Sequence, residues 1–318
     1  MKTPTPPLES FNTLPIIAPC EHIAGSERFI LKAFSLQERF TNSAKQCLVD
    51  LTLDLEDGAP VGEEDTLRDA FVELLHSKHN TQNQAGIRIH PLSSEHAVKD
   101  LETLITKAGD KIRYITIPKV SSTREVAWAR GLVQHYSSEA KLQRPIPFHL
   151  LIETHEALNE LDAIASLPHI ETFDFGLMDY ISQCDGVISD SAMRSPEQFR
   201  HPLLRATKTR IALTALQNGI IPSHNVTIEF RNTEQTYHDA HTARTEYGFM
   251  RMWSIHPSQI EPIINGMLPE ADEINQAIEI LEHAEQASWG PIEHNGRLHD
   301  RASYRYYWNL IRCAHQNT

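Results

Sequence analysis

Short apolar segments alternate with longer segments in which apolar residues recur at helical spacing, as at Phe71, Leu74 and Leu75. Glycine and proline residues separate many of these segments and indicate turns between them. Eight short apolar segments predict β-strands, at residues 15–20, 47–55, 86–90, 114–118, 148–152, 172–176, 225–230 and 252–255. A helix is predicted after each strand, over residues 27–40, 66–77, 96–108, 124–136, 155–167, 202–218, 234–247 and 257–267.

These eight strand–helix units predict a TIM (β/α)8 barrel, in which parallel strands of nearly continuous apolar sequence close into a ring. A doubly wound open sheet is the alternative, but no GxGxxG motif follows the first predicted strand. The barrel is expected over residues 14–268, after a flexible N-terminal arm at residues 1–13. Residues 269–318 are expected to form a C-terminal helical extension or lid, because their polar and aromatic-rich patterns do not continue the repeat.

Composition narrows the class of protein. The formal net charge of −13 argues against nucleic acid or an anionic membrane as the main partner, because both require a basic surface. No apolar run is long enough to span a membrane, and the N-terminal residues do not resemble a signal peptide. The four cysteines include no CxxC pair, so reduced thiols and a cytoplasmic location are expected.

Two acids follow neighbouring predicted strands, Glu153 after the fifth and Asp179 after the sixth. The carboxyl ends of adjacent parallel strands share one face, so we expect these side chains to lie close together. Paired carboxylates favour a hard cation, Mg²⁺ or Mn²⁺, over zinc. Each acid could instead cap the helix that follows it. The pairing of the two acids on adjacent strands favours the metal site.

Other charged residues lie at predicted strand ends, where barrel enzymes carry their functional groups. Arg88 lies within an apolar run, where its charge is costly unless it is paired. It either forms a structural ion pair with Glu56 or Asp57, or it binds an anionic or enolate oxygen at the barrel mouth. Glu56 and Asp57 lie in the sequence LDLEDG. They either form a helix-capping turn or support metal-bound water and Arg88.

Two further candidates follow the fourth and eighth predicted strands. Lys119 is interpreted either as a surface lysine or as a partner for carboxylates at the barrel mouth. His256 ends the eighth strand before a proline and is interpreted as a substrate contact or as a structural residue. We take both as candidate cofactor-binding residues.

Six segments in order resemble the citrate lyase β-subunit-like proteins of the HpcH/HpaI aldolase superfamily, which include malyl-CoA and citramalyl-CoA lyases. A seventh segment resembles the family's C-terminal segment that ends in an aspartate. The segments are LDLEDG (53–58), IRIHPL (87–92), IPKV (117–120), LIET (151–154), FGLMDY (175–180), SIHPSQI (254–260) and NGRLHDRAS (295–303). The resemblance extends over about residues 15–310.

The chain departs from the family pattern at some positions. Arg251 and Met252 replace the glycine and lysine that often precede the IHP motif, and His224 and Asn225 replace an Asp-Gly pair near the seventh strand. The loop after the first strand also differs. A divergent branch of the family is therefore expected, with CoA or another thioester as the acyl carrier.

The resemblance implies Mg²⁺ dependence, with Glu153 and Asp179 as metal ligands. It implies that Arg88 faces the thioester oxygen, with Glu56 and Asp57 as acids of the second strand. Asp300 corresponds to a catalytic aspartate that a neighbouring subunit delivers in some relatives, which are commonly trimers or hexamers. A homo-oligomer is therefore expected.

The predicted function is that of a Mg²⁺-dependent carbon–carbon lyase. It would cleave or form a 3-hydroxyacyl thioester such as citryl-, malyl- or citramalyl-CoA through an enolate. One alternative is a metal-dependent aldolase that releases pyruvate from a 4-hydroxy-2-oxo acid. Another is a barrel that binds a metabolite without turnover.

Overall fold

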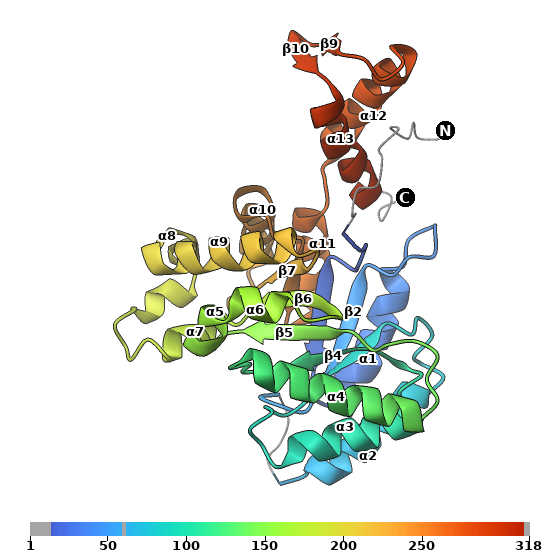
Figure 1. Cartoon of the computed structure of the whole chain (residues 1–318), viewed down its shortest axis with the longest axis vertical. Coiled ribbons are helices and arrows are strands. Elements are labelled where there is room, and N and C mark those ends of the chain that lie inside the picture. Colours follow the sequence, from blue (N-terminus) through green and yellow to red (C-terminus); the bar gives the residue numbers. More distant parts are fainter. Residues whose placement is uncertain (1–13, 59–61, 315–318) are drawn as a thin grey trace. The chain divides into compact units, whose positions relative to one another are not determined.

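The computed structural model describes residues 14–58 and 62–314, so the predicted arm at residues 1–13 lies outside the described residues. Within them, parallel strands pair in sequence order from β1 to β8, and β8 pairs with β1 to close the ring (Figure 1). The predicted TIM barrel is confirmed. Its strands are β1 (Cys20–Ala24), β2 (Val49–Asp54), β3 (Ala85–Arg88), β4 (Ile112–Ile117), β5 (Phe148–Ile152), β6 (Ile170–Phe175), β7 (Ile221–His224) and β8 (Arg251–Ser254).

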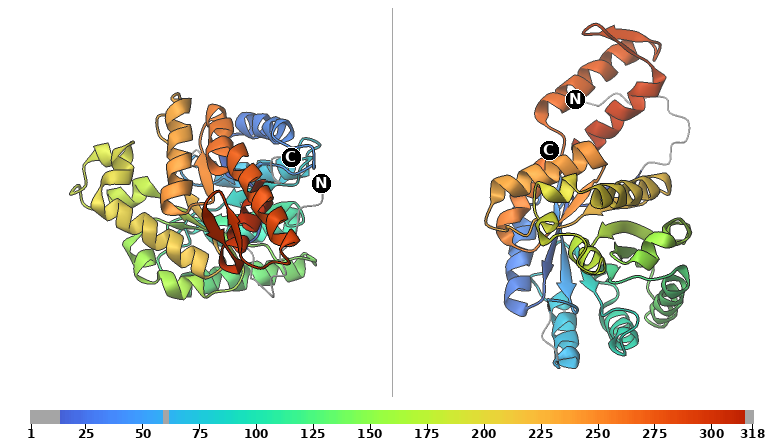
Figure 2. Two further views of the ribbon diagram at one scale, coloured as in Figure 1. Left: turned by 90° about the horizontal axis from the view of Figure 1, so that it is seen from above. Right: turned by 90° about the vertical axis from the view of Figure 1, so that its left-hand side faces the viewer.

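Helices cover the outside of the ring, as the two views in Figure 2 show. They bury apolar faces against the strands, as α3 does with Leu101, Leu104 and Ile105. Ser122 and Thr154 cap α4 and α5 through their side chains. The helices of the barrel are α1 (Glu27–Arg39), α2 (Glu64–His76), α3 (His96–Ala108), α4 (Thr123–Glu139), α5 (His155–Asn159), α6 (Leu161–Ala165), α7 (Leu177–Ser182), η1 (Asp190–Met193), α8 (Glu197–Arg200), α9 (Pro202–Gln217), α10 (Thr233–Tyr247), η2 (Pro257–Gln259) and α11 (Ile260–Met267).

Two strand positions were predicted wrongly. The first strand lies at Cys20–Ala24 rather than at residues 15–20, and the seventh at Ile221–His224 rather than at residues 225–230. Both true strands carry buried polar side chains that point into the ring, including Glu21 and Ser223. A search for apolar runs therefore selected the neighbouring segments. Residues 225–230 form the loop that follows β7.

The centre of the barrel contains a buried ionic network in place of a wholly apolar core. Arg251 on β8 bonds Glu21 on β1 at 2.8 Å and Asp50 on β2 at 2.7 Å. Tyr114 stacks on His149 with 3.7 Å between ring centroids. Buried charges are tolerated only when paired, and the two bonds of Arg251 join the consecutive strands β8, β1 and β2. The network explains why Arg251 replaces the small residue expected before the IHP motif.

The chain divides into two compact units. One is the barrel, which comprises Ile17–Thr41 and Cys47–Met267; the other contains the residues from Leu268 onward. In this second unit, α12 (Ala271–Gln286) packs on α13 (Arg301–Ala314) through Ile280, Leu281 and Tyr304. An antiparallel hairpin of β9 (Ile292–His294) and β10 (Arg297–His299) joins the two helices. None of the helices in the described ranges combines the length and apolar character that membrane crossing requires.

Candidate metal and substrate site

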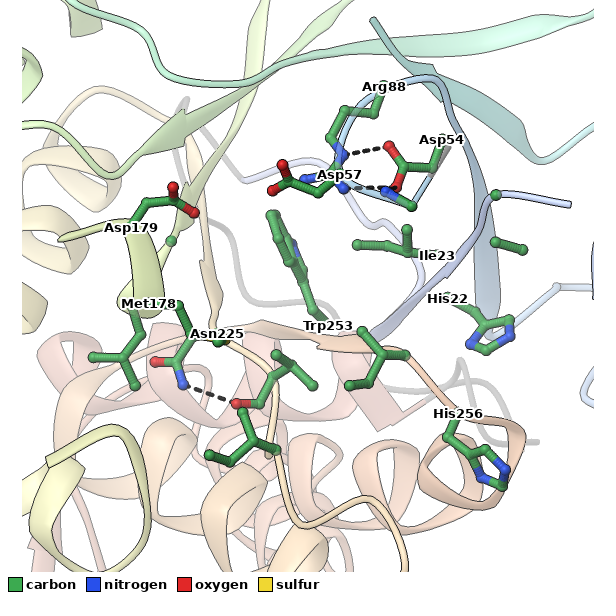
Figure 3. Close-up of a pocket in the computed structure, with 18 of the residues that line it drawn as sticks. His22, Ile23, Asp54, Asp57, Arg88, Met178, Asp179, Asn225, Trp253 and His256 are labelled. Atoms are coloured by element: carbon green, nitrogen blue, oxygen red, sulfur yellow. Dashed lines mark hydrogen bonds and ion pairs between the residues drawn. The ribbon is translucent and has the colours of Figure 1, made fainter. Parts of the chain in front are cut away.

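A cavity of about 460 Å³ opens at the carboxyl ends of the barrel strands. This is the end at which TIM-barrel enzymes place their active sites. Figure 3 shows charged side chains on the β2, β3 and β6 side and imidazole rings on the β1 and β8 side. The polar and aromatic lining includes His22, Asp54, Asp57, Arg88, Glu153, Asp179, Asn225, Trp253 and His256.

Glu153 and Asp179 both line this cavity, as the position of their strands predicts. The backbone N–H of Lys119 donates to Glu153 Oε1 at 2.7 Å and fixes the carboxylate. Glu153 is 2% exposed. Its burial and the neighbouring Asp179 carboxylate raise the pKa of Glu153 to about 8. A cation bound between the two acids would stabilise the charged form of Glu153.

Gly176 provides the space that the Glu153 carboxylate occupies. A Cβ atom at residue 176 would lie 2.0 Å from Glu153 Oε2 and 2.6 Å from Glu153 Cβ. Any larger residue would therefore displace the acid. The close approach of Gly176 thus keeps the Glu153 carboxylate in its position. The two carboxylates offer only oxygen donors, which suit Mg²⁺ or a similar hard cation.

Arg88 is fixed by two acids, Asp54 at the end of the neighbouring strand β2 and Glu56 in the turn that follows this strand. Its Nε and Nη2 donate to the two oxygens of Asp54, each at 2.6 Å, and Nη1 lies 2.9 Å from Glu56 Oε2. The ion pair expected with Glu56 is present. Asp54 is the second partner, because strand register places it directly beside Arg88. Although burial opposes the charge, these acids raise the pKa of Arg88 and keep it cationic.

The turn after β2 is built around the same aspartate. Asp54 also accepts the backbone N–H of Glu56 at 3.0 Å and of Gly58 at 2.8 Å. A Cβ atom at residue 58 would lie 2.4 Å from Asp54 Oδ2, so the glycine of LDLEDG permits the turn. Asp57 is mainly exposed, and its carboxylate lies 3.5 Å from Lys119 Nζ.

Lys119 connects the acidic turn with the candidate metal site. Its ammonium group pairs with Glu56, and its backbone N–H holds Glu153. The interpretation of Lys119 as a carboxylate partner at the barrel mouth is therefore supported by its contacts. The Lys119 side chain contacts Glu56, which also contacts Arg88.

The β1 and β8 side of the cavity contains two histidines. His22 Nδ1 lies 3.0 Å from Ser254 Oγ, and burial, together with His256, lowers the pKa of His22 to about 4. His256 is exposed at the cavity wall, and its Nδ1 accepts the Ser258 N–H at 3.2 Å. Lys32 of α1 also lines the cavity and acts electrostatically on His22, so this side contrasts with the acidic side.

Trp253 stands between these two sides (Figure 3). Its indole Nε1 donates to Asp174 Oδ1 at 3.1 Å inside the barrel, and this bond fixes the orientation of the ring. The sequence interpretation did not select Asp54, His22, Asn225 or Trp253 as site residues. Only Asp54 had a signal in the sequence. The alternation within LDLEDG indicated that Asp54 shares a face with Glu56.

Asp300 lies in the second unit of the chain. Its Oδ1 accepts the backbone N–H of Ala302 at 3.0 Å at the beginning of α13. The other predicted site residues all belong to the barrel unit. The contacts that Asp300 makes within the second unit are those of a helix cap.

A second group of side chains that could ligate a metal, Glu21, His149 and Asp174, lies buried inside the barrel, with ligand atoms within 4.8 Å of one another. Arg251 already bonds Glu21 at 2.8 Å, and Trp253 bonds Asp174. These bonds indicate an ion network that supports the barrel, distinct from Glu153 and Asp179.

Comparison with known proteins places these residues in one family. Residues 39–257 match the family model described as HpcH/HpaI aldolase/citrate lyase. That range includes every predicted site residue except Asp300. An L-malyl-CoA/beta-methylmalyl-CoA lyase of Cereibacter sphaeroides is 23% identical over 276 residues, which cover 83% of this chain and 86% of that protein. A malyl-CoA/beta-methylmalyl-CoA/citramalyl-CoA lyase of Chloroflexus aurantiacus is 22% identical over 85% of this chain and 81% of that protein.

Solved structures show the same fold. A citrate lyase from Burkholderia xenovorans LB400 is 41% identical with a TM-score of 0.87, and the match covers 96% of this chain and 93% of that chain. CitE from Mycobacterium tuberculosis, in complex with magnesium, acetoacetate and coenzyme A, is 20% identical with a TM-score of 0.70, over 96% of this chain and 100% of that chain. The relatives are named lyases, which confirms the predicted enzyme class. This chain belongs to the HpcH/HpaI aldolase/citrate lyase family of carbon–carbon lyases.

Proposed function

We propose that this protein is a divalent-metal-dependent lyase that cleaves or forms the carbon–carbon bond of a 3-hydroxyacyl thioester. The observation that carries this proposal is the shared cavity lined by Glu153, Asp179 and Arg88. Two acids suited to a cation and one fixed arginine are the charges that retro-aldol cleavage through an enolate requires.

Glu153 and Asp179 would hold the metal, which we propose is Mg²⁺. When bound, the cation would bind substrate oxygens and stabilise negative charge on them. The Lys119 N–H keeps Glu153 oriented, and Gly176 leaves it the necessary space. The complex of the related CitE with magnesium supports this choice of cation.

Arg88 would stabilise the oxygen of the thioester as it becomes an enolate. A guanidinium has five N–H donors, and the contacts to Asp54 and Glu56 engage three of them. Among the residues that the structure describes, two donors thus remain for a ligand. Because Asp54 and Glu56 hold the group in place beforehand, little reorganisation is needed when charge develops.

Glu56, Asp57 and Lys119 would support this arrangement from one side of the cavity. Lys119 balances the charge of Glu56 while Glu56 contacts Arg88. Asp57 is the most accessible of these acids, and it would hold water or a substrate hydroxyl near the cavity entrance. His256 would contact the acyl carrier at the opposite wall, which it lines.

The acyl carrier is proposed to be coenzyme A. Relatives are named as lyases of malyl-CoA and citramalyl-CoA, and CitE was crystallised with coenzyme A. Asp300 is proposed to exchange a proton with the enolate carbon, delivered by a neighbouring subunit of a homotrimer or hexamer. The fragment released with the carbonyl group would be a 2-oxo acid.

The direct test is to incubate the purified protein with Mg²⁺ and malyl-CoA, citramalyl-CoA or citryl-CoA and to follow the acyl-CoA and oxo-acid products. Metal-dependent cleavage that EDTA abolishes is the expected result. The family description also includes aldolases, so a 4-hydroxy-2-oxo acid belongs in the same assay. Pyruvate from that acid, with all CoA esters intact, would favour the aldolase and contradict the proposed substrate class.

A further inference from the structure

One ring nitrogen in the cavity wall has no partner within the described part of the chain. His22 lies on β1, lines the cavity and is 3% exposed. Among the described residues, its Nε2 makes no hydrogen bond, and yet this atom is not one of the unpaired side-chain atoms that are sealed from solvent. Since the cavity is the space that His22 lines, Nε2 is accessible to a ligand bound there.

The other nitrogen of the ring determines where the imidazole carries its proton. His22 Nδ1 lies 3.0 Å from Ser254 Oγ, which lies 3.0 Å from the carbonyl oxygen of His256. A carbonyl oxygen can only accept, and a serine hydroxyl has a single proton to donate. Ser254 therefore donates to His256 and accepts from the Nδ1–H of His22. In a neutral ring this arrangement leaves Nε2 unprotonated, so Nε2 is a hydrogen-bond acceptor.

His22 is both neutral and fixed in position. Burial, together with the nearby His256, lowers the pKa of His22 to about 4, so the ring carries no charge at neutral pH. His22 and Ser254 also face each other in the backbone register of β1 and β8. Two adjacent strands of the barrel thus hold one acceptor at the cavity wall.

The surroundings of His22 differ from those of the candidate metal site. Figure 3 shows His22 and His256 on the side of the cavity opposite Asp179. Phe29 and Ile255 line the same cavity and are 57% and 46% exposed. Apolar side chains around a polar acceptor suit a ligand segment that is largely apolar and carries few polar groups. This segment is distinct from the hydroxy-acid end, which the metal would hold.

We infer that His22 is a specificity-determining residue whose Nε2 accepts a hydrogen bond from an amide N–H on the carrier arm of the acyl thioester. The inference rests on the proposed function, because the arm of coenzyme A is the part of the substrate that contains amide groups. A fixed acceptor discriminates against ligands that lack the donor, because the acceptor then stays unpaired.

Three substitutions separate the acceptor from the volume of the ring. His22→Phe keeps a ring and removes the acceptor, whereas His22→Asn removes the acceptor and reduces the volume. His22→Gln is the conservative variant, because its amide oxygen reaches about as far as Nε2. His79→Asn is the matched control, because exposed His79 follows α2 and does not line the cavity.

Calorimetry in the presence of Mg²⁺ measures the binding of two ligands. Acetyl-CoA contains amide N–H groups, whereas L-malate offers a hydroxyl and carboxylates. We expect His22→Phe and His22→Asn to bind acetyl-CoA about tenfold more weakly and L-malate like the wild type. The affinity of His22→Gln for acetyl-CoA should stay within about threefold of the wild type. The control should bind both ligands normally.

Thermal unfolding identifies the variants that fold, and either His22→Phe or His22→Asn is sufficient for the test. Normal affinity for acetyl-CoA in the folded variants would overturn the inference. A loss confined to L-malate, an equal loss for both ligands, no recovery in His22→Gln, or a wild type that does not bind acetyl-CoA would also overturn it. Turnover of malyl-CoA by the wild type tests the proposed function separately, because an active enzyme whose acetyl-CoA affinity is independent of His22 contradicts the inference alone.

Discussion

Gly176 offers the sharpest test of the candidate metal site at the scale of a single residue. Gly176→Ala places a methyl group against Glu153 without removing any charge, because a Cβ there would lie 2.0 Å from Oε2. We expect at least about tenfold weaker Mg²⁺ binding, since the carboxylate must leave its position. Calorimetric titration of Mg²⁺ measures this effect.

Gly131→Ala is the matched control for this substitution. Gly131 lies within α4, and a Cβ there would meet nothing within 4 Å. Alanine should stabilise the helix by about 0.5–1 kcal/mol and leave Mg²⁺ affinity unchanged. Equal affinities in Gly176→Ala and Gly131→Ala would contradict the assignment of Glu153 as a ligand.

Arg88 provides a second prediction at this scale. Arg88→Lys keeps the charge but cannot bond Asp54 through two donors, contact Glu56 and still offer donors to a ligand. We expect turnover to fall about 10²–10³-fold, the usual effect of losing a fixed electrostatic group. Steady-state kinetics with a cleaved thioester measures the loss, and thermal unfolding shows whether the barrel persists. A lysine variant with normal turnover would show that charge alone is sufficient.

The sequence predicted which residues lie at the cavity where a simple positional rule applies. Glu153, Asp179 and Arg88 follow or end correctly placed strands, and all three line one cavity. Asp54 was not selected, because its pairing with Arg88 depends on the register of β2 against β3. Asn225 was assigned to a strand, because the polar sequence of β7 shifted the predicted strand into the following loop.

At the scale of elements, the strands are held together by ions inside the barrel. Glu171 on β6 lies 3.0 Å from His149 on β5 and 2.8 Å from Arg113 on β4. Although burial alone would raise the pKa of Glu171, His149 and Arg113 lower it to about 2, from a usual value of 4.5. Three neighbouring strands are thus connected through one carboxylate.

This connection predicts a pH dependence of stability. Because the folded pKa of Glu171 is lower than the unfolded value, its contribution is present above about pH 4.5 and is lost as the pH falls toward 2. The gap corresponds to about 3 kcal/mol. Glu171→Gln should therefore be less stable than the wild type at pH 6, and the difference should shrink below pH 4.5. Urea unfolding at several pH values measures it; a constant difference would contradict the assigned ion pairs.

The polar interior also explains which elements the sequence could predict. Strand β5, which contains an apolar run at residues 150–152, and strand β6, in which Phe173 and Phe175 alternate with polar residues, were placed within two residues at each end. Strands β1 and β7, which contribute Glu21, Ser223 and His224 to the buried interior, were displaced. The sequences of β1 (CEHIA) and β7 (IPSH) contain neither a long apolar run nor a regular alternation, so the neighbouring segments were selected instead.

At the scale of the whole molecule, the number and order of the strand–helix units were sufficient to predict the barrel. An extension after residue 268 was predicted because the pattern ceases to repeat there, and the residues from Leu268 onward belong to the second compact unit. The relation of Asp300 to a catalytic site could not come from spacing, since its contacts in the described residues are those of a helix cap in the second unit.

A complementation experiment tests the proposed role of Asp300. Asp300→Asn and Glu153→Gln should each be inactive alone, because each lacks a group that the reaction requires. If Asp300 acts on a neighbouring subunit, co-assembled oligomers of the two variants contain some sites with both wild-type groups, and activity returns. Mixed assemblies made by co-expression provide the sample. Activity no greater than the sum of the two separate variants would contradict action between subunits.

The most direct test of the central claim, that Glu153 and Asp179 hold the catalytic cation, combines Mg²⁺ titration with turnover in Glu153→Gln and Asp179→Asn. The account predicts loss of Mg²⁺ binding by at least about tenfold and of turnover by about 10²–10³-fold. It also predicts that metal-free Glu153→Gln is at least as stable as the wild type, because burial and Asp179 raise the pKa of Glu153 to about 8. Wild-type Mg²⁺ affinity and turnover in both variants would contradict the account.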